Sequence, residues 1–423
     1  MAREIERSIE AVWRMESGRI VGGVARLVRD VVLAEDLAQE ALIAALERWP
    51  AAGVPDNPGA WLMAVAKNKA LDHLRLQALQ ARKHGELGAD ADARGDHVEP
   101  DFVDALDAAH ADDIGDDLLR LIFAACHPVL PKEAQTALTL KLLGGLSTPE
   151  IARAYVVPEA TIAQRIVRAK KALSQAAVPF EVPRGAERVP RLAAVLEVIY
   201  LVFNEGYAAT SGQEWMRPAL CEEALRLARM LASILPQEPE THGLQALLEI
   251  QASRLRARTD AKGRPVLLMD QDRARWDRLL IGRGLAALDR ACALGRPLGP
   301  YALQAAIAAC HARAVTPQAT DWPAIVALYD ELVDQLPSPV AELNRSVAIG
   351  MAHGPAAALP LVEALAAEPA MQRYGLLHAV RGDLLARLGL APDACRAFER
   401  AAELASNEQD EALMRRWADE LRG

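Results

Sequence analysis

The stretch Leu146–Leu173 reads LSTPEIARAYVVPEATIAQRIVRAKKAL and predicts two short helices joined by a tight turn. Ser147 followed three residues later by Glu150 has the spacing of a capping box, which opens a helix. Glu159 stands where the first turn of a second helix favours an acidic side chain. Apolar residues then recur at helical spacing and form one stripe of that helix: Ile162, Ile166, Ala169 and Leu173. The pattern predicts a helix-turn-helix.

A different face of the second helix is polar. It carries Thr161, Gln164, Arg165 and Arg168, with Lys170 and Lys171 close behind. Arg and Gln side chains donate hydrogen bonds to base edges in the DNA major groove, and Lys side chains contact phosphates. Basic helix faces are often simply solvated. Because a short helix, a turn, a second helix and positive charge coincide in one window, we favour DNA binding.

Charge is distributed unevenly along the chain. The 423 residues hold 48 Lys and Arg against 57 Asp and Glu, a net charge of -9, so any nucleic-acid site must be local. Residues 1–82 are balanced, 84–117 hold 12 acidic residues and one basic residue, and 118–175 hold eight basic and three acidic residues. We therefore predict four segments: a helical domain (1–82), an acidic linker (83–117), a basic helical domain (118–178) and a C-terminal extension (190–423).

Composition predicts an all-α fold, because Ala and Leu dominate while aromatic residues make up only 4%. The start of the sequence has no apolar signal core, and no uncharged apolar run reaches about 18 residues, so we expect a cytoplasmic protein without membrane contact. The five cysteines form no CxxC pair, which argues for buried thiols rather than a metal site. Without a P-loop, GxSxG or HExxH motif, we expect no enzyme, no catalytic residue and no cofactor.

The C-terminal extension is a run of Ala- and Leu-rich helices in pairs. Its last pair matches the 34-residue tetratricopeptide pattern at Gly382, Leu385, Gly389, Ala394, Phe398 and Ala401, with Ser406 at the usual Pro position. Weaker copies of the second helix occur at Ala224–Pro236, Ile325–Pro337 and Ala358–Leu365. Stacked pairs bury a continuous core, so we expect a tetratricopeptide-like α-solenoid rather than unrelated hairpins.

Two further segments carry candidate binding residues. The helix from Trp61 places Asn68, Asp72 and Arg75 on the same side as the tryptophan, directly after the Pro- and Gly-rich loop PAAGVPDNPGA. Trp61 is either a core anchor or a base-stacking residue. In the extension, DQDRARWD (Asp270–Asp277) either docks a partner or forms local ion pairs, and we favour ion pairs.

The runs LAEDLAQEALIAALERW (Leu33–Trp49) and NPGAWLMAVAKNKALDHLR (Asn57–Arg75), followed by the helix-turn-helix, resemble regions 2 and 4 of bacterial extracytoplasmic-function sigma factors. The resemblance covers about the first 180 residues. YLVFNEGY (Tyr200–Tyr207), DQDRARWD and the tetratricopeptide-like helices look like the C-terminal extension of one subgroup of these factors. Pro158 stands where relatives usually carry a Ser cap.

The resemblance implies roles for individual residues. By resemblance, Asp36, Gln39 and Glu40 would contact the β′ clamp helices of RNA polymerase core. The β flap of the polymerase is a further expected contact of the chain. The Gly53–Ala60 loop would capture a flipped promoter base, and minus-ten DNA would be read and melted by Trp61, Lys67, Asn68, Asp72 and Arg75. Minus-thirty-five DNA would be read by Glu159, Ala160, Thr161, Gln164, Arg165, Arg168 and Lys171.

The expected function is therefore that of a sigma factor, with three points left open. A stand-alone helix-turn-helix regulator with a helical-repeat sensor is the alternative, although such a regulator needs neither a clamp-binding helix nor a melting loop. The acidic linker either mimics nucleic acid in the polymerase cleft or serves as a solubilising spacer. The C-terminal repeats either restrain regions 2 and 4 within the chain or help to hold polymerase.

Overall fold

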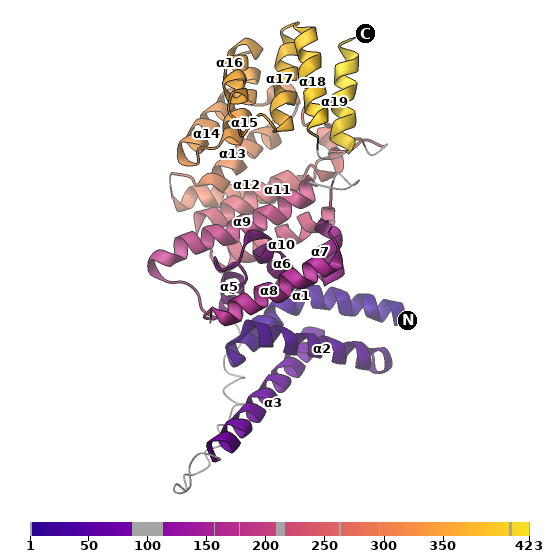
Figure 1. Cartoon of the computed structure of the whole chain (residues 1–423), viewed down its shortest axis with the longest axis vertical. Coiled ribbons are helices and arrows are strands. Elements are labelled where there is room, and N and C mark those ends of the chain that lie inside the picture. Colours follow the sequence, from indigo (N-terminus) through magenta and orange to yellow (C-terminus); the bar gives the residue numbers. More distant parts are fainter. Residues whose placement is uncertain are drawn as a thin grey trace. The chain divides into compact units, whose positions relative to one another are not determined.

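The computed structural model describes residues 2–86, 113–155, 157–176, 178–208, 216–261, 264–295, 297–405 and 408–422. Within these ranges the chain is helical, and its β-structure is a single isolated bridge between Thr259 and Pro265 (Figure 1). The chain divides into two compact units, Met1–Val198 and Ile199–Gly423, which we call unit 1 and unit 2. The predicted all-α fold is confirmed.

Unit 1 includes both segments predicted to be helical domains, 1–82 and 118–178, which we call the two modules. Its N-terminal helices are α1 (Ala2–Val28), α2 (Val31–Ala52) and α3 (Pro58–Glu86), and its later helices are α5 (Asp113–Ala125), α6 (Lys132–Leu142), α7 (Thr148–Tyr155) and α8 (Glu159–Gln175). Asp30 starts α2 by accepting the backbone N–H groups of Val32 and Leu33, at 2.7 and 3.1 Å. Most of the acidic linker (83–117) lies outside the described residues.

Helix α1 connects the two modules. It packs against α2 and α3 on the N-terminal side and against α5 on the other. A Cβ atom at Gly22 would lie 3.1 Å from the backbone oxygen of Asp117, so glycine allows α1 and α5 to approach closely. Residues far apart in the sequence therefore share one core.

Helix α9 (Arg188–Tyr207) follows, and the boundary between the two units falls within it. Pro190 lies in its first turn, where the missing N–H of proline leaves no helical hydrogen bond unmade. Unit 2 continues with α10 (Pro218–Ile234), α11 (Pro239–Ala252), α12 (Arg278–Leu294), α13 (Pro300–Arg313), α14 (Trp322–Gln335), α15 (Pro339–Ala352), α16 (Pro355–Ala366), α17 (Gly375–Arg387), α18 (Ala391–Glu403) and α19 (Glu408–Glu420). Each of these packs chiefly against a helix one or two places before or after it in the chain, which is the arrangement of an α-solenoid.

The predicted tetratricopeptide pair is formed by α17 and α18. Phe398 is buried, and a Cβ atom at Gly382 would lie 2.8 Å from its ring, so glycine leaves room for the aromatic side chain. Gly389 makes the turn with φ of 78°. The apolar positions of the weaker copies that are fully buried are Ala224, Ala228, Leu231, Ile325, Leu332, Ala358, Val362 and Leu365. Ser406 lies outside the described residues.

The DQDRARWD segment folds differently from the favoured interpretation. The carboxylates of Asp272 and Asp277 cap the helical turns that follow them by accepting backbone N–H groups. Arg273 is buried and donates to the carbonyl oxygen of His311 at 2.7 Å. The prediction of local ion pairs was wrong because short-range spacing does not reveal that an arginine is drawn into the core by carbonyls about 40 residues away.

The cysteines lie within the helix packing. Cys126, Cys221 and Cys395 are buried, and Cys292 and Cys310 are half-buried. Burial raises the pKa of Cys126 to about 11 and that of Cys221 to about 12. Within the described ranges, no group of three or more His, Cys, Asp or Glu side chains is arranged to hold a metal ion.

Candidate nucleic-acid interface

The helix-turn-helix forms as predicted. Ser147 and Glu150 make the capping box: the Ser147 N–H donates to the Glu150 carboxylate at 2.8 Å, and the Glu150 N–H donates to the Ser147 hydroxyl at 3.4 Å. The buried residues of α8 are the four of the predicted apolar stripe: Ile162, Ile166, Ala169 and Leu173. Helix α8 packs with this stripe against α6 and α7.

The face of α8 predicted to read DNA is open to solvent. The exposed members are Glu159, Ala160, Thr161, Gln164, Arg168 and Lys171, and Arg165 is half-buried. Pro158 begins α8 without a side-chain hydrogen bond to the helix, as its lack of a hydroxyl requires. The exposed guanidinium and amide groups are hydrogen-bond donors that match base edges. Because the apolar stripe is buried, these donors lie on the solvent-facing side of α8.

Helix α3 carries the predicted minus-ten residues. Asn68, Asp72 and Arg75 are exposed, and Lys67 is half-buried. Trp61 is also half-buried, and its ring meets the buried Trp49 edge-on at 5.4 Å between ring centres. Trp61 is therefore anchored by aromatic packing and still has an exposed portion.

The loop before α3 leaves polar atoms accessible. Residues 53–57 separate α2 from α3, and Asp56 and Asn57 are exposed. The Asn57 side chain accepts the N–H of Ala60 at 3.1 Å, which caps α3. One end of this loop is thus fixed to the helix whose residues are candidates for DNA contact.

Three acidic side chains of α2 form hydrogen bonds within the chain. Glu40 accepts a hydrogen bond from Lys69 of α3 at 2.6 Å, and Asp36 accepts one from Lys170 of α8 at 3.1 Å. Gln39, the third residue predicted to contact polymerase, is half-buried. The sequence prediction missed Glu35, a buried carboxylate that also pairs with Lys170. A carboxylate on the buried side of an amphipathic helix implies a cationic partner, which is the signal that could have drawn attention to it.

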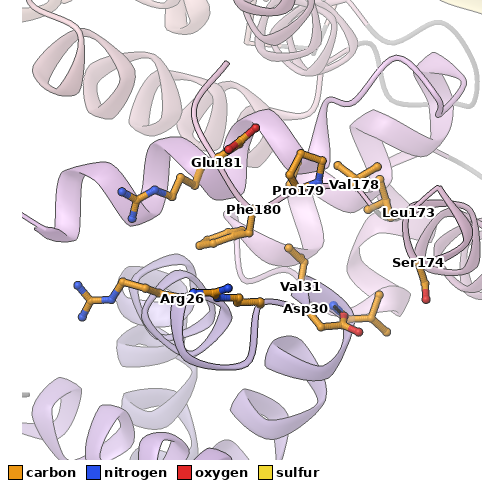
Figure 2. Close-up of a pocket in the computed structure, with 13 residues that line it drawn as sticks. Arg26, Asp30, Val31, Leu173, Ser174, Val178, Pro179, Phe180 and Glu181 are labelled. Carbon is orange, nitrogen blue, oxygen red and sulfur yellow. Dashed lines mark hydrogen bonds between the residues drawn. The ribbon is translucent and has the colours of Figure 1, made fainter. Parts of the chain in front are cut away.

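A cavity of about 680 Å³ adjoins this region. Figure 2 shows Pro179 and Phe180 on one side of it and Arg26, Asp30 and Val31 on the other. The lining arginines Arg26, Arg29 and Arg120 are offset by Asp30 and Glu181, and Asp117 pairs with both Arg26 and Arg120. The formal charges of these three arginines and three carboxylates sum to zero, with Asp117 lying outside the lining.

Three family profiles match parts of the chain. The profile of sigma-70 region 2 matches residues 13–79, that of sigma-70 region 4 matches residues 120–173, and a family of unknown function, DUF6596, matches residues 191–292. The matched segments contain the candidate residues of α2, α3 and α8, and the third covers α10 and α11.

One relative matches nearly the whole chain, and two others match less than half of it. An uncharacterized protein of Rhizobium meliloti is 47% identical over 402 residues, which is 95% of this chain and 93% of that protein. RNA polymerase sigma-H factor of Pseudomonas aeruginosa is 33% identical over 166 residues, 38% of this chain and 82% of its own length. Probable ECF RNA polymerase sigma factor SigI of Mycobacterium tuberculosis is 27% identical over 183 residues, 43% of this chain and 59% of its own length.

Within the described residues, no helix has the length and apolar character needed to cross a membrane.

The buried stripe of α8, its exposed polar face and the matches to regions 2 and 4 agree with one another. The chain therefore belongs to the extracytoplasmic-function sigma factors of the sigma-70 family and carries a C-terminal helical extension.

Proposed function

We propose that this chain directs RNA polymerase core to promoters in the cytoplasm by reading minus-ten and minus-thirty-five elements, without turnover chemistry of its own. The observation that carries the proposal is the division of α8 into a buried apolar stripe and an exposed polar face. Its apolar stripe is buried in the helix-turn-helix, while Gln164 and Arg168 are exposed on the face that would enter the major groove.

In this proposal α2 binds RNA polymerase and α3 binds promoter DNA. Asp36, Gln39 and Glu40 of α2 contact the basic clamp helices of the β′ subunit, because an acidic face complements a basic coiled coil. Asn68, Asp72 and Arg75 of α3 read and melt the minus-ten element, while Trp61 and the 53–60 loop hold an extruded base. The β flap contacts the helix-turn-helix module, and the two modules correspond to segments 1–82 and 118–178.

The test of the assignment is co-elution of the full chain with core RNA polymerase, followed by run-off transcription on genomic fragments. We expect a complex and specific start sites. Glu40→Lys should weaken co-elution, because it reverses the charge offered to the clamp. A chain that binds operator DNA but never core polymerase would instead support the stand-alone regulator.

Arg168→Ala tests the reading helix. We expect roughly tenfold weaker promoter binding, since one good base contact is worth about 1–3 kcal/mol, with unchanged affinity for core polymerase. Arg415→Ala is the matched control, because it also removes an exposed arginine side chain, 69% exposed, but from α19 in unit 2. Equal loss of DNA and polymerase binding in Arg168→Ala would assign this residue a structural role.

The extension (190–423) is proposed to act on sigma activity through the solenoid surface of unit 2. Removing residues 208–423 keeps α9 whole and leaves regions 2 and 4 intact in sequence. A rise in run-off transcription would mean that the repeats restrain the factor, and a fall would mean that they assist it. Unchanged transcription, with unchanged polymerase affinity, would remove both roles.

A further inference from the structure

Lys170 links the DNA-reading helix to the polymerase-binding helix. Its ammonium group donates to the carboxylates of both Glu35 and Asp36 of α2, the latter at 3.1 Å. The Lys170 side chain is 18% exposed and the Glu35 side chain 5% exposed. Burial alone would lower the pKa of Lys170, but the carboxylates of Glu35 and Asp36 raise it above its usual value. The ammonium group is therefore held in its charged form by α2.

Among the described residues, charged contacts join the two modules at two further places. Arg14 of α1 pairs with Glu150 of α7, the first helix of the helix-turn-helix. Burial would raise the pKa of Glu150, but hydrogen bonds from Ser147 and the charge of Arg14 hold it below its usual value. Arg26 of α1 lies 3.5 Å from the buried Asp117 carboxylate of α5. All these contacts join the region 2 side of unit 1 to the region 4 side.

This arrangement is incompatible with simultaneous reading of two promoter elements. Elements named minus ten and minus thirty-five are about 25 base pairs apart, which is roughly 85 Å along B-form DNA. In unit 1 the reading helix α8 is instead bonded directly to α2, which packs against the minus-ten helix α3. The contact must break before both elements can be bound.

The chain between the modules is long enough for that separation. Residues 87–112 connect α3 to α5, and 26 residues span at most about 90 Å when fully extended. Opening thus requires loss of these charged contacts and of the packing of α1 against α5 and α6, while each helix can stay folded.

We propose that Lys170 holds a closed form of the free factor by occupying the carboxylates of α2 that polymerase must engage. This inference rests on the proposed contact between α2 and the clamp helices. It adds that Lys170 and the clamp helices compete for the same carboxylates of α2. Asp36 accepts a hydrogen bond either from Lys170 or from a basic residue of polymerase. Binding to the core then releases α8, so the reading helix becomes free when the factor is in place on the enzyme.

Two variants of the full chain test the competition. Lys170→Met removes the cation, and Glu35→Gln removes the buried charge while leaving both α8 and the residues assigned to polymerase intact. We expect both to bind core polymerase, in the absence of DNA, about tenfold more tightly than the parent chain, equivalent to ~1.4 kcal/mol. Lys141→Met is the matched control, a lysine of α6 in the same unit, and should leave the affinity unchanged. Equal or weaker binding by Lys170→Met and Glu35→Gln would overturn the proposal.

A distance measurement separates failure of this inference from failure of the proposed function. Spin labels at Gln77 of α3 and Ser174 of α8, both exposed, report the separation of the modules without polymerase. We expect one short distance in the parent chain and a longer, broader distribution in Lys170→Met and Glu35→Gln. A long distance in the parent chain, or no change in the variants, would overturn the closed form. A short distance that lengthens in the variants, in a chain that never binds polymerase, would support the closed form and refute the proposed function.

Discussion

Each of the two units is stabilised by its own internal contacts. The residues in contact are close in sequence in unit 2 and far apart in sequence in unit 1. In unit 2 each helix packs chiefly against its neighbours in the chain. In unit 1 the decisive contacts join residues 135 or 136 positions apart, Glu35 with Lys170 and Arg14 with Glu150. A solenoid is stabilised by many similar neighbour interfaces, whereas unit 1 depends on one interface between two modules. From this difference we expect that unit 1 opens by separating its two modules as a whole, and that opening in unit 2 stays local to a few helices.

Phe398→Ala should give the largest effect and tests whether unit 2 is a chain of local interfaces. Removal of a buried Phe ring costs about 3–5 kcal/mol. Hydrogen exchange should show lost protection in α17–α19 and unchanged protection in α10–α13. Arg400→Ala, in the same helix but at an exposed ion pair, should have little effect. Uniform loss of protection across unit 2 would break the comparison.

Acid should weaken unit 2 through His311. Burial, together with the charges of Arg254 and Arg273, lowers the pKa of His311 from 6.5 to about 4. Since the unfolded chain takes up the proton first, the free energy of unfolding should fall by about 3 kcal/mol as the pH drops from 6.5 to 4, and stay level above 6.5. His311→Gln should flatten this dependence in urea titrations of the full chain, and His353→Gln, at an exposed site, should not. A steep fall that persists in His311→Gln would assign it to other groups.

Asp117→Asn tests the interface of unit 1. Its carboxylate is buried between Arg26 and Arg120, with the Arg120 contact at 2.8 Å. Loss of the charge should destabilise the α1–α5 contact by about 2 kcal/mol, because two partly buried guanidinium groups lose their shared partner. Exchange protection should fall in both α1 and α5, while Glu133→Gln, at an exposed position of α6, serves as the control. Loss confined to α5 would mean that the modules do not stabilise one another.

Glu411→Gln should have the smallest effect. Glu411 and Arg415 form an exposed i, i+4 pair on α19, with side chains 42% and 69% exposed. We expect a change of less than about 0.5 kcal/mol in the free energy of unfolding of unit 2. A value near that of Asp117→Asn would remove the distinction between surface pairs and the contacts between modules.

Local periodicity predicted most of the fold. The buried stripe of α8 follows from spacings of three and four residues, and the packing of Phe398 against Gly382 follows from the tetratricopeptide pattern, which places a small residue on one helix of the pair and a large one on the other. The same reasoning placed Gln164 and Arg168 on an exposed face. These features depend only on helix geometry, which the sequence expresses within a few turns.

Long-range contacts were beyond such reasoning. Lys170 was interpreted as a phosphate contact, and its bonds to Glu35 and Asp36 depend on the packing of α1 against α5, which periodicity does not encode. Arg273 likewise reaches carbonyl oxygens about 40 residues away. Charged side chains near the end of an apolar stripe have no unique partner in the sequence, and tertiary packing selects one.

The buried cysteines have a consequence for chemical reactivity. A thiol reacts as its thiolate, and a pKa of about 11 leaves roughly one thiolate in ten thousand at pH 7. Alkylating reagents and peroxides would therefore meet nearly inert sulfur at Cys126 and Cys221. Both residues should stay reduced under oxidants that readily modify an accessible thiol introduced on the surface.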